Sequence, residues 1–262
     1  MIDLHQHLLF GIDDGSPDLA TSVAMVQLAA ADGITHIVAT PHANDTYPYS
    51  LAHNQALLQQ IRDALPPSTH MQLGLGCDFH LNFENTADAR TNAAQYTINQ
   101  TEYLLVELPD IGIPKRIDEV FYNMRVDGIT PILTHPERNA TLQRNRTPLL
   151  DWVRSGLLLQ VTAGSLTGQF GKQAESIAWD LLDKQCVQFL ATDGHNISRR
   201  PPVMGPARDL LAARLGIETA TRLTVTNPLA VFNGHPLPAS PAPSDLFQGE
   251  EEDKPWYKRI FR

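Results

Sequence analysis

Seven short apolar segments alternate with helix-forming segments over the first 195 residues, and this alternation constrains the fold more than any other feature. The apolar segments are residues 1–7, 34–42, 71–79, 102–108, 129–135, 157–164 and 187–195. Strands that are separated by helices usually pair in parallel, because each helix returns the chain to the end of the sheet where the next strand begins. The sequence therefore predicts an α/β fold with a parallel, barrel-like arrangement of strands.

The segments between the predicted strands carry helix signals. In the first of them, Ser16 is the predicted N-cap, Pro17 fits the first helical position and Gly33 ends the helix. Further helices are predicted at residues 51–65, 115–126, 147–155, 172–184 and 206–215. Near Asn233 the composition changes to a Pro/Ala/Ser-rich stretch, which is followed by an acidic run and a basic, aromatic end. We therefore expect one barrel at residues 1–237 and a linker with a tail at residues 238–262.

Composition and charge exclude several classes of protein. A hydrophobic content of 42% is enough for a sizeable core in a chain of 262 residues. The net charge is −9, and no long basic run occurs in the first two hundred residues, which argues against binding to a nucleic-acid backbone. The two cysteines, Cys77 and Cys186, lie in apolar segments, which predicts buried free thiols. With no signal-peptide pattern and no apolar run of about 20 residues, we expect a soluble, cytoplasmic protein.

Histidine and acidic residues recur at or just after the C-terminal ends of the predicted strands. His5 and His7 are two residues apart, so both side chains lie on one face of a strand. Any one such residue could have a purely structural role, but C-terminal strand ends meet at one face of a parallel barrel. A single zinc ion needs about four ligands, so this larger set indicates two or three metal ions that share a bridging carboxylate. The nine candidate ligands are His5, His7, Asp14, His42, Asp78, Glu107, His135, Asp193 and His195. Mixed histidine and carboxylate ligation without sulfur suits manganese, iron or zinc.

The motifs that carry these residues support a family resemblance. They are MIDLHQH, GIDDG, ATPH, LVEL, ITPILTHPER, ATDGHN, RRPP and NPLAVFNGHPLP, and they run from Met1 to about Leu237. The chain resembles the polymerase and histidinol phosphatase (PHP) superfamily, and within it the bacterial manganese-dependent protein-tyrosine phosphatases of the CpsB/CapC/YwqE group. This resemblance implies a distorted barrel of about seven βα units with a trinuclear metal site at the C-terminal strand ends.

The resemblance also implies a role for each residue. It places His5, His7, Asp78 and Asp193 on one metal ion, Asp78, Glu107 and His135 on a second, and Asp14, His42 and His195 on a third. Arg138 and Arg200 match positions that contact the substrate phosphate. Asp78 departs from the family, which usually has glutamate as the bridging ligand, and an aspartate side chain is about 1.5 Å shorter. His80, two residues further on, is an alternative ligand or a solvent-facing loop histidine, and Asp13 is expected to point away from Asp14 and to cap the turn at Gly15.

The reaction implied is hydrolysis of phosphotyrosine by a metal-bound hydroxide, because a bound metal lowers the pKa of water to about 7. The expected substrate is a phosphotyrosine protein, such as a bacterial tyrosine kinase of polysaccharide export, in exopolysaccharide or capsule regulation. The alternatives are a small-molecule phosphatase, such as a histidinol-phosphate phosphatase, and a non-catalytic metal-bound regulator of such a kinase. The basic, aromatic tail is either a solubilising end or a segment that docks on a partner or on an anionic membrane surface.

Overall fold

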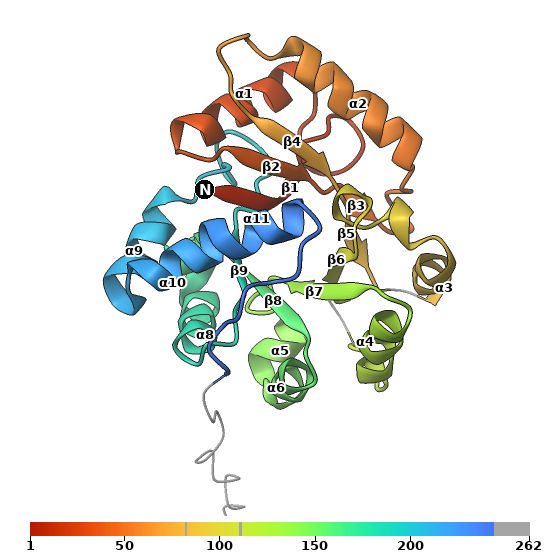
Figure 1. The fold of residues 1–262 in the computed structure, drawn as a ribbon, viewed down its shortest axis with the longest axis vertical. Coiled ribbons are helices and arrows are strands. Elements are labelled where there is room, and N and C mark those ends of the chain that lie inside the picture. Colours follow the sequence, from red (N-terminus) through yellow and green to blue (C-terminus); the bar gives the residue numbers. More distant parts are fainter. Residues whose placement is uncertain (82, 110–111, 244–262) are drawn as a thin grey trace, which may run out of the picture.

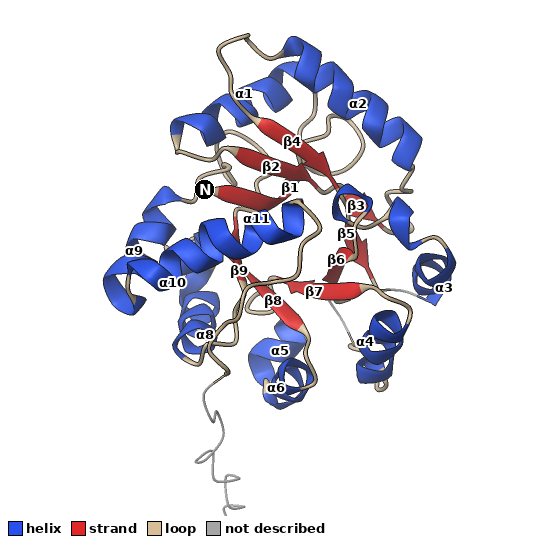
Figure 2. Cartoon of the chain, in the orientation of Figure 1, coloured by secondary structure: helices blue, strands red, loops and turns tan. Residues whose placement is uncertain are grey.

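The structure, a computed structural model, describes residues 1–81, 83–109 and 112–243 of the chain. Strands occupy the middle of the molecule and helices surround them (Figure 1, Figure 2). All strand pairs among these residues are parallel, which confirms the predicted α/β class. The strands are β1 (Ile2–Gln6), β2 (His36–Ala39), β3 (His42–Ala43), β4 (Gln72–Leu75), β5 (Asp78–His80), β6 (Tyr103–Glu107), β7 (Thr130–Thr134), β8 (Leu158–Thr162) and β9 (Phe189–Ala191).

The strands form two sheets, with the orders β1-β2-β4 and β3-β5-β6-β7-β8-β9. The second and third apolar segments each supply one strand to both sheets, because each segment breaks in the middle. Pro41 has no N–H to donate at the break between β2 and β3. Backbone bonds nevertheless continue across the breaks, from Gly76 N to Ala39 O (2.9 Å) and from Asp78 N to Pro41 O (3.0 Å). The two sheets are therefore connected through continuous segments of chain.

All six predicted helices are present, with ends within about two residues of the prediction, and the described residues form five further short helices that the sequence pattern does not predict. They are α1 (Leu19–Ala31), α2 (Leu51–Ala64), α3 (Phe83–Thr91), α4 (Ile117–Val126), α5 (Ala140–Arg144), α6 (Thr147–Arg154), α7 (Ala163–Leu166), α8 (Gly171–Asp183), α9 (Gly205–Leu215), α10 (Ile217–Thr221) and α11 (Asn227–Phe232). Short 3₁₀ turns, η1 (Ala93–Gln95) and η2 (Ile98–Gln100), precede β6, and a π-helical turn, η3 (Arg222–Thr226), joins α10 to α11.

The N-cap of α1 is Asp18, so the prediction of Ser16 as the cap is wrong. The Asp18 carboxylate accepts a hydrogen bond from Thr21 N at 2.8 Å. A carboxylate at a helix N-terminus also interacts favourably with the helix dipole, which a serine hydroxyl does not do as strongly. The Ser16 hydroxyl is used elsewhere, since it donates to Asp18 O at 2.9 Å.

Two hydrophobic clusters form the core. The larger one lies mainly between helices and sheets. The smaller one joins strands of both sheets and includes Leu4, Leu105 and Phe189 together with Val231 of α11, the helix that crosses in front of the strands in Figure 1. The pairing of β1 with β2 is irregular between Asp3 and Gln6. A bulge of this kind changes the side to which the following side chains point. Leu4 can therefore pack in this cluster while the His5 side chain turns toward the C-terminal ends of the strands.

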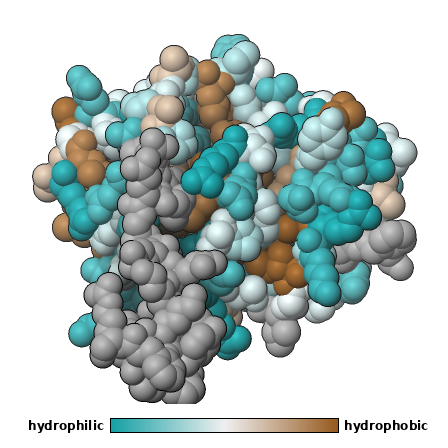
Figure 3. Space-filling view, turned by 90° about the horizontal axis from the view of Figure 1, so that it is seen from below, coloured by the Kyte–Doolittle hydropathy of each residue, from teal (hydrophilic) through white to brown (hydrophobic). Residues whose placement is uncertain are grey.

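The described part of the chain after α11 has no regular secondary structure, and residues 238–243 are exposed. Residues 244–262, including the predicted docking segment of the tail, lie outside the described residues. Among the described helices, none combines the length and the apolar character that crossing a membrane requires. On the face seen in Figure 3, hydrophilic and intermediate residues predominate and the hydrophobic ones form separate patches.

Candidate active site

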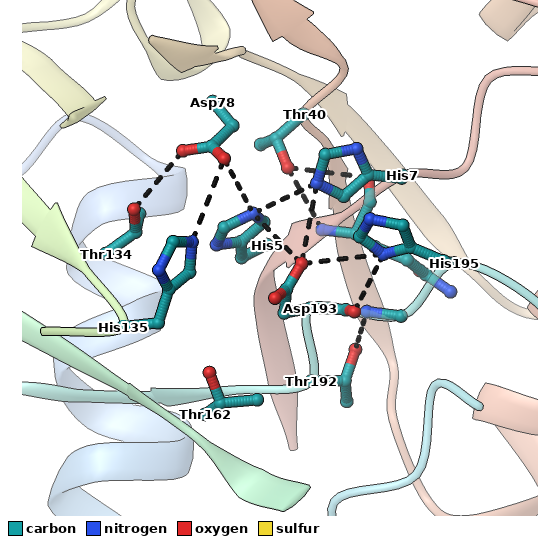
Figure 4. Close-up of polar contacts among 12 residues, drawn as sticks. His5, His7, Thr40, Asp78, Thr134, His135, Thr162, Thr192, Asp193 and His195 are labelled. Carbon is teal, nitrogen blue, oxygen red and sulfur yellow. Dashed lines mark hydrogen bonds and ion pairs between the residues drawn. The ribbon is translucent and has the colours of Figure 1, made fainter. Parts of the chain in front are cut away.

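The structure brings all nine predicted ligand residues together near the C-terminal ends of the strands. Their imidazole nitrogens and carboxylate oxygens form four overlapping clusters, and within each cluster the atoms lie within 4.8 Å of one another. The clusters are His7, Asp14, His42 and His195; His5, Asp78 and His135; His5, His7 and Asp193; and His42, Asp78 and Glu107. In Figure 4 the labelled histidines, Asp78 and Asp193 point toward a common centre.

Asp78 occupies the middle of this arrangement. Its Oδ2 lies 3.6 Å from His5 Nε2, 3.5 Å from His42 Nδ1 and 3.9 Å from His135 Nε2. The other oxygen, Oδ1, lies 3.3 Å from the Thr134 hydroxyl. Burial opposes ionisation of Asp78, but the surrounding imidazoles, with His5 first, hold the pKa of this carboxyl well below its usual range. The aspartate therefore reaches three histidines from different strands in spite of its shorter side chain.

Three of the histidines are oriented through Nδ1. His5 Nδ1 lies 2.7 Å from Gln160 Oε1, His7 Nδ1 lies 2.9 Å from Asp13 Oδ2, and His195 Nδ1 lies 2.9 Å from Asp193 O. Each of these partners is an oxygen that accepts, so Nδ1 carries a hydrogen, and Nε2 is the ring nitrogen that faces the site. The Nε2 atoms of His5 and His7 are 3.3 Å apart. This arrangement of an acceptor behind each ring is typical of metal-binding histidines.

Asp13 has a larger role than the sequence predicts. Its Oδ1 accepts from Gly15 N at 2.9 Å, which confirms the predicted cap of the turn. Its Oδ2 in addition contacts the His7 ring and accepts from His42 N at 3.2 Å, a role beside the site that the sequence does not predict. The chain is not extended here, because a Cβ at position 15 would lie only 2.4 Å from His7 O, and glycine allows this close turn. The Asp-Asp-Gly sequence thereby places one carboxylate behind His7 and the next, Asp14, in front of it.

Asp193 connects the histidines to the two predicted arginines. Its Oδ1 lies 3.4 Å from His5 Nε2 and 3.5 Å from His7 Nε2. Its Oδ2 accepts hydrogen bonds from both Arg138 and Arg200. Asp193 has a φ of 52°, in the left-handed region that residues other than glycine rarely adopt. Such a conformation persists only where the surroundings enforce it, and here it directs the carboxylate into the site.

The electrostatics of the site favour a positive charge at its centre. Burial lowers the pKa of His5 to about 4, which keeps this imidazole neutral at neutral pH. Burial also opposes protonation of His7, but the carboxylates of Asp13 and Asp193 outweigh it and raise the pKa of His7 to about 10. The contacts of its Oδ1 with His195 Nε2 (3.5 Å) and His42 Nε2 (3.4 Å) keep the pKa of Asp14 low. Cations bind to ionised carboxylates and neutral imidazoles, so a cation at this centre would displace the proton that His7 holds in its absence.

The donor set fits divalent cations. Among the described residues, Asp78 Oδ2 and His42 Nδ1 are buried without a hydrogen-bond partner. A buried polar atom without a partner is costly, and a cation between these two atoms would satisfy both. The set contains five imidazoles and four carboxylates and no sulfur, a combination that suits manganese, iron or zinc.

Comparison with known proteins identifies the family. The sequence model for capsular polysaccharide synthesis proteins, CpsB/CapC, matches residues 1–233. The chain belongs to the CpsB/CapC family. Tyrosine-protein phosphatase YwqE of Bacillus subtilis (strain 168) is 32% identical over 239 residues, which cover 89% of this chain and 92% of YwqE. Tyrosine-protein phosphatase CpsB of Streptococcus pneumoniae is 26% identical over 241 residues, which cover 88% and 98% of the two chains.

The CpsB/CapC assignment is supported by a solved structure. A study of YwqE from Bacillus subtilis and CpsB from Streptococcus pneumoniae describes them as unique metal-dependent tyrosine phosphatases. The matching chain aligns with a TM-score of 0.83 and 29% sequence identity, over 93% of this chain and 98% of that chain. The fold and the motifs therefore agree on the family.

Several polar residues around the CpsB/CapC site are not predicted from the sequence. Gln160 lies inside the apolar segment 157–164, and Glu137 lies between two residues that already have assigned roles. Glu137 is buried, and its Oε1 accepts from Thr162 N at 3.0 Å and from the Ser165 hydroxyl at 2.7 Å. A polar residue in an otherwise apolar strand is the only signal that points to Gln160. Nothing in the local pattern distinguishes Glu137 from a surface glutamate.

His80 and the two cysteines are not part of the nine-residue site. His80 is in strand β5, beside Glu107 in the pairing register, and is half-buried, so its interpretation as a solvent-facing loop residue is wrong. It belongs to none of the four clusters. Cys77 and Cys186 are buried and free, as predicted. Burial raises the pKa of both thiols, to about 11 for Cys186, which opposes formation of a nucleophilic thiolate.

Proposed function

We propose that this chain is a metal-dependent tyrosine-protein phosphatase of capsule or exopolysaccharide synthesis. The observation that carries the proposal is the convergence of five imidazoles and four carboxylates on one centre, with two arginines on its edge. Names of family members support the substrate class, since YwqE and CpsB are both called tyrosine-protein phosphatases. The PHP-type resemblance further suggests that the two sheets act as one distorted barrel with the site at its rim.

The four clusters suggest how two or three ions would be held. We propose His5, His7, Asp78 and Asp193 as ligands of one ion, Asp78, Glu107 and His135 as ligands of a second, and Asp14, His42 and His195 as ligands of a third. Asp78 is the bridging carboxylate of this scheme, because its unpartnered Oδ2 faces histidines of more than one cluster. Manganese is the proposed native metal, with iron or zinc as the alternatives. When bound, these ions would supply hydroxide at neutral pH and would neutralise charge on the phosphate.

The chain's own side chains bind and orient the substrate in this proposal. Arg138 and Arg200 hold the phosphate oxygens, since a planar guanidinium can grip two oxygens at once. Burial and the Asp193 carboxylate act in opposite directions on Arg138, and Asp193 prevails and raises the pKa of the guanidinium, so it stays charged. The tyrosine leaving group has a pKa near 10 and needs little protonation to depart. The buried thiols take no part.

The decisive experiment is phosphate release from a phosphotyrosine peptide and from histidinol phosphate, each with added Mn²⁺ and with a chelator. We expect turnover of the peptide that requires metal and exceeds turnover of histidinol phosphate. Preference for histidinol phosphate would assign a small-molecule phosphatase instead. No turnover of either substrate by the metal-loaded protein would favour a non-catalytic regulator of a polysaccharide-export kinase, the proposed partner.

A further inference from the structure

We propose that Phe170 is a positioning residue that holds both phosphate-binding arginines at the edge of the site. Phe170 is half-buried and lies between α7 and α8, outside the nine-residue cluster. The centre of the Arg138 guanidinium lies 4.2 Å from the centroid of the Phe170 ring, and that of Arg200 lies 5.8 Å from it. One aromatic ring is therefore shared by the two cations. This proposal rests on the proposed function only in naming phosphate as the group that the arginines bind.

The Phe170 ring offsets the repulsion between the two guanidinium groups at this edge of the site. Arg138 and Arg200 both donate to the same atom, Asp193 Oδ2, so two positive charges lie close together. Their mutual repulsion would favour rotation of one guanidinium into solvent, and about a quarter of each side chain is exposed (23% and 25%). The negative face of an aromatic ring attracts a cation within about 6 Å of its centroid. Asp193 offers the two arginines only one shared oxygen. The Phe170 ring therefore supplies the second attraction that keeps both guanidinium groups at the edge of the site.

The position of the ring is itself fixed by contacts with neighbours of both arginines. Glu137, next to Arg138, accepts from Thr162 N and from Ser165 at the start of α7. Gln169, next to Phe170, donates through Nε2 to Arg199 O, next to Arg200. A Cβ at position 164 would lie 2.4 Å from Gln169 Oε1 and 2.9 Å from Phe170 Cε2, so the Phe170 ring packs directly on the backbone of Gly164 in α7. The segment around Phe170 is thus hydrogen-bonded to the loops that carry Arg138 and Arg200.

Hydrogen bonds hold the backbone of the loop that carries Arg200. Asn196 Oδ1 accepts from the backbone N–H groups of Ser198, Arg199 and Arg200 at 2.7–3.1 Å. Arg200 O in turn accepts from His195 N at 2.9 Å. Because the backbone is held, the remaining freedom of Arg200 lies in its side chain, which is the part that faces the ring.

Affinity for inorganic phosphate tests the proposal directly. We would compare the Mn²⁺-loaded wild-type protein with Phe170→Leu, which removes the ring, and Phe170→Tyr, which keeps it. The readouts are the Kd of inorganic phosphate by calorimetry, kcat and KM for a phosphotyrosine peptide, the metal content and Tm. We expect Phe170→Leu to raise the phosphate Kd and KM by about five- to tenfold, with metal content kept and kcat within about threefold. Phe170→Tyr should stay within about twofold of wild type in all readouts.

Two further variants separate positioning from general destabilisation. Trp179 on α8 makes the same kind of contact with Arg214, at 4.7 Å, away from the site, so Trp179→Leu is a matched control that should leave phosphate Kd and KM unchanged. In an Arg138→Ala, Arg200→Ala background, adding Phe170→Leu should change phosphate Kd by less than about twofold, because the ring has no cation left to hold.

The proposal is overturned if Phe170→Leu binds phosphate as tightly as wild type, or if it weakens binding equally with and without the two arginines. It is also overturned if Phe170→Tyr behaves like Phe170→Leu. These results differ from a failure of the proposed function. In that case the wild-type protein would not hydrolyse phosphotyrosine, while its phosphate Kd and the effect of Phe170 on it could still be measured.

Discussion

At the scale of single residues, the roles of the site side chains depend on which atoms lie behind them. Asp13, Gln160 and the Asp193 carbonyl orient three imidazoles through Nδ1. Such partners come from positions that have no fixed spacing to the histidines, so the sequence predicts which side chains cluster better than it predicts the groups that orient them. Asp13 shows this most clearly, since an extended chain would turn it away from His7 and the Gly15 turn brings it back.

The Asp78 carboxylate should cost more to remove than a ligand at the edge of the site. We expect Asp78→Ala to lose most of the metal bound at two sites and nearly all turnover, because without it two cations would repel each other with little screening. His42→Ala should lose less. Asp78→Glu, which restores the usual family residue, should keep measurable activity. Elemental analysis and phosphotyrosine hydrolysis measure the effects. Full metal occupancy in Asp78→Ala together with metal loss in His80→Ala would instead assign the bridge to the histidine.

Asp3 should make the metal-free protein less stable as the pH rises. Burial raises its pKa from 3.8 to about 7. Between these values the folded protein keeps a proton that the unfolded chain has lost, so the stability from this group is complete below about pH 4 and is lost as the pH rises through 7. Asn at this position cannot ionise. The free energy of unfolding of Asp3→Asn should therefore exceed that of wild type by a margin that grows by on the order of 2 kcal/mol between about pH 5 and about pH 8.

Urea unfolding at the two pH values measures this margin. The amide can replace the carboxyl in the contacts with Thr192, whose N–H lies 2.9 Å from Asp3 Oδ1 and whose hydroxyl lies 2.5 Å from Oδ2. A margin that stays the same at both pH values would show that Asp3 is already ionised in the folded protein.

At the scale of secondary structure elements, periodic apolar segments predict the strands and helices well, but local capping competes with the simplest sequence pattern. Ser16 followed by Pro17 is a common helix start, yet the chain uses Asp18 two residues later. The division of the second and third apolar segments between two sheets is likewise absent from the pattern. It follows from Pro41 and from how the neighbouring segments pair across the break, which depends on residues far away in the sequence.

One cap connects two helices and offers a test at this scale. Asp32, at the end of α1, accepts from Met204 N at 2.6 Å and from Gly205 N at 2.8 Å, at the start of α9. We expect Asp32→Ala to lower the free energy of unfolding by about 1–2 kcal/mol, because two backbone donors lose a charged acceptor. The exposed Asp63, which accepts from Gln59 on α2, is the control, and Asp63→Ala should cost less than about 0.5 kcal/mol. Equal costs for the two variants would contradict this role for Asp32.

At the scale of the whole molecule, the C-terminal ends of parallel strands from both sheets meet, and the histidines and carboxylates at these ends form one cluster. His7 N donates to Gly194 O and Asp193 N donates to His5 O, both at 2.9 Å, so the first and last strand segments meet at the site. This meeting brings His5 and His7 to Asp193 from almost two hundred residues away. The repeated position of histidines and carboxylates after strands makes the clustering of these nine side chains predictable, whereas their exact grouping requires the three-dimensional register of both sheets.

The number of bound cations decides whether the nine residues form one multinuclear metal centre that drives hydrolysis. Metal-free protein is titrated with Mn²⁺, and bound metal and phosphotyrosine hydrolysis are measured on the same samples. We expect two to three equivalents to bind, with activity rising as the later equivalents fill. Saturation at a single equivalent, or full activity in the metal-free protein, would contradict a multinuclear catalytic metal centre.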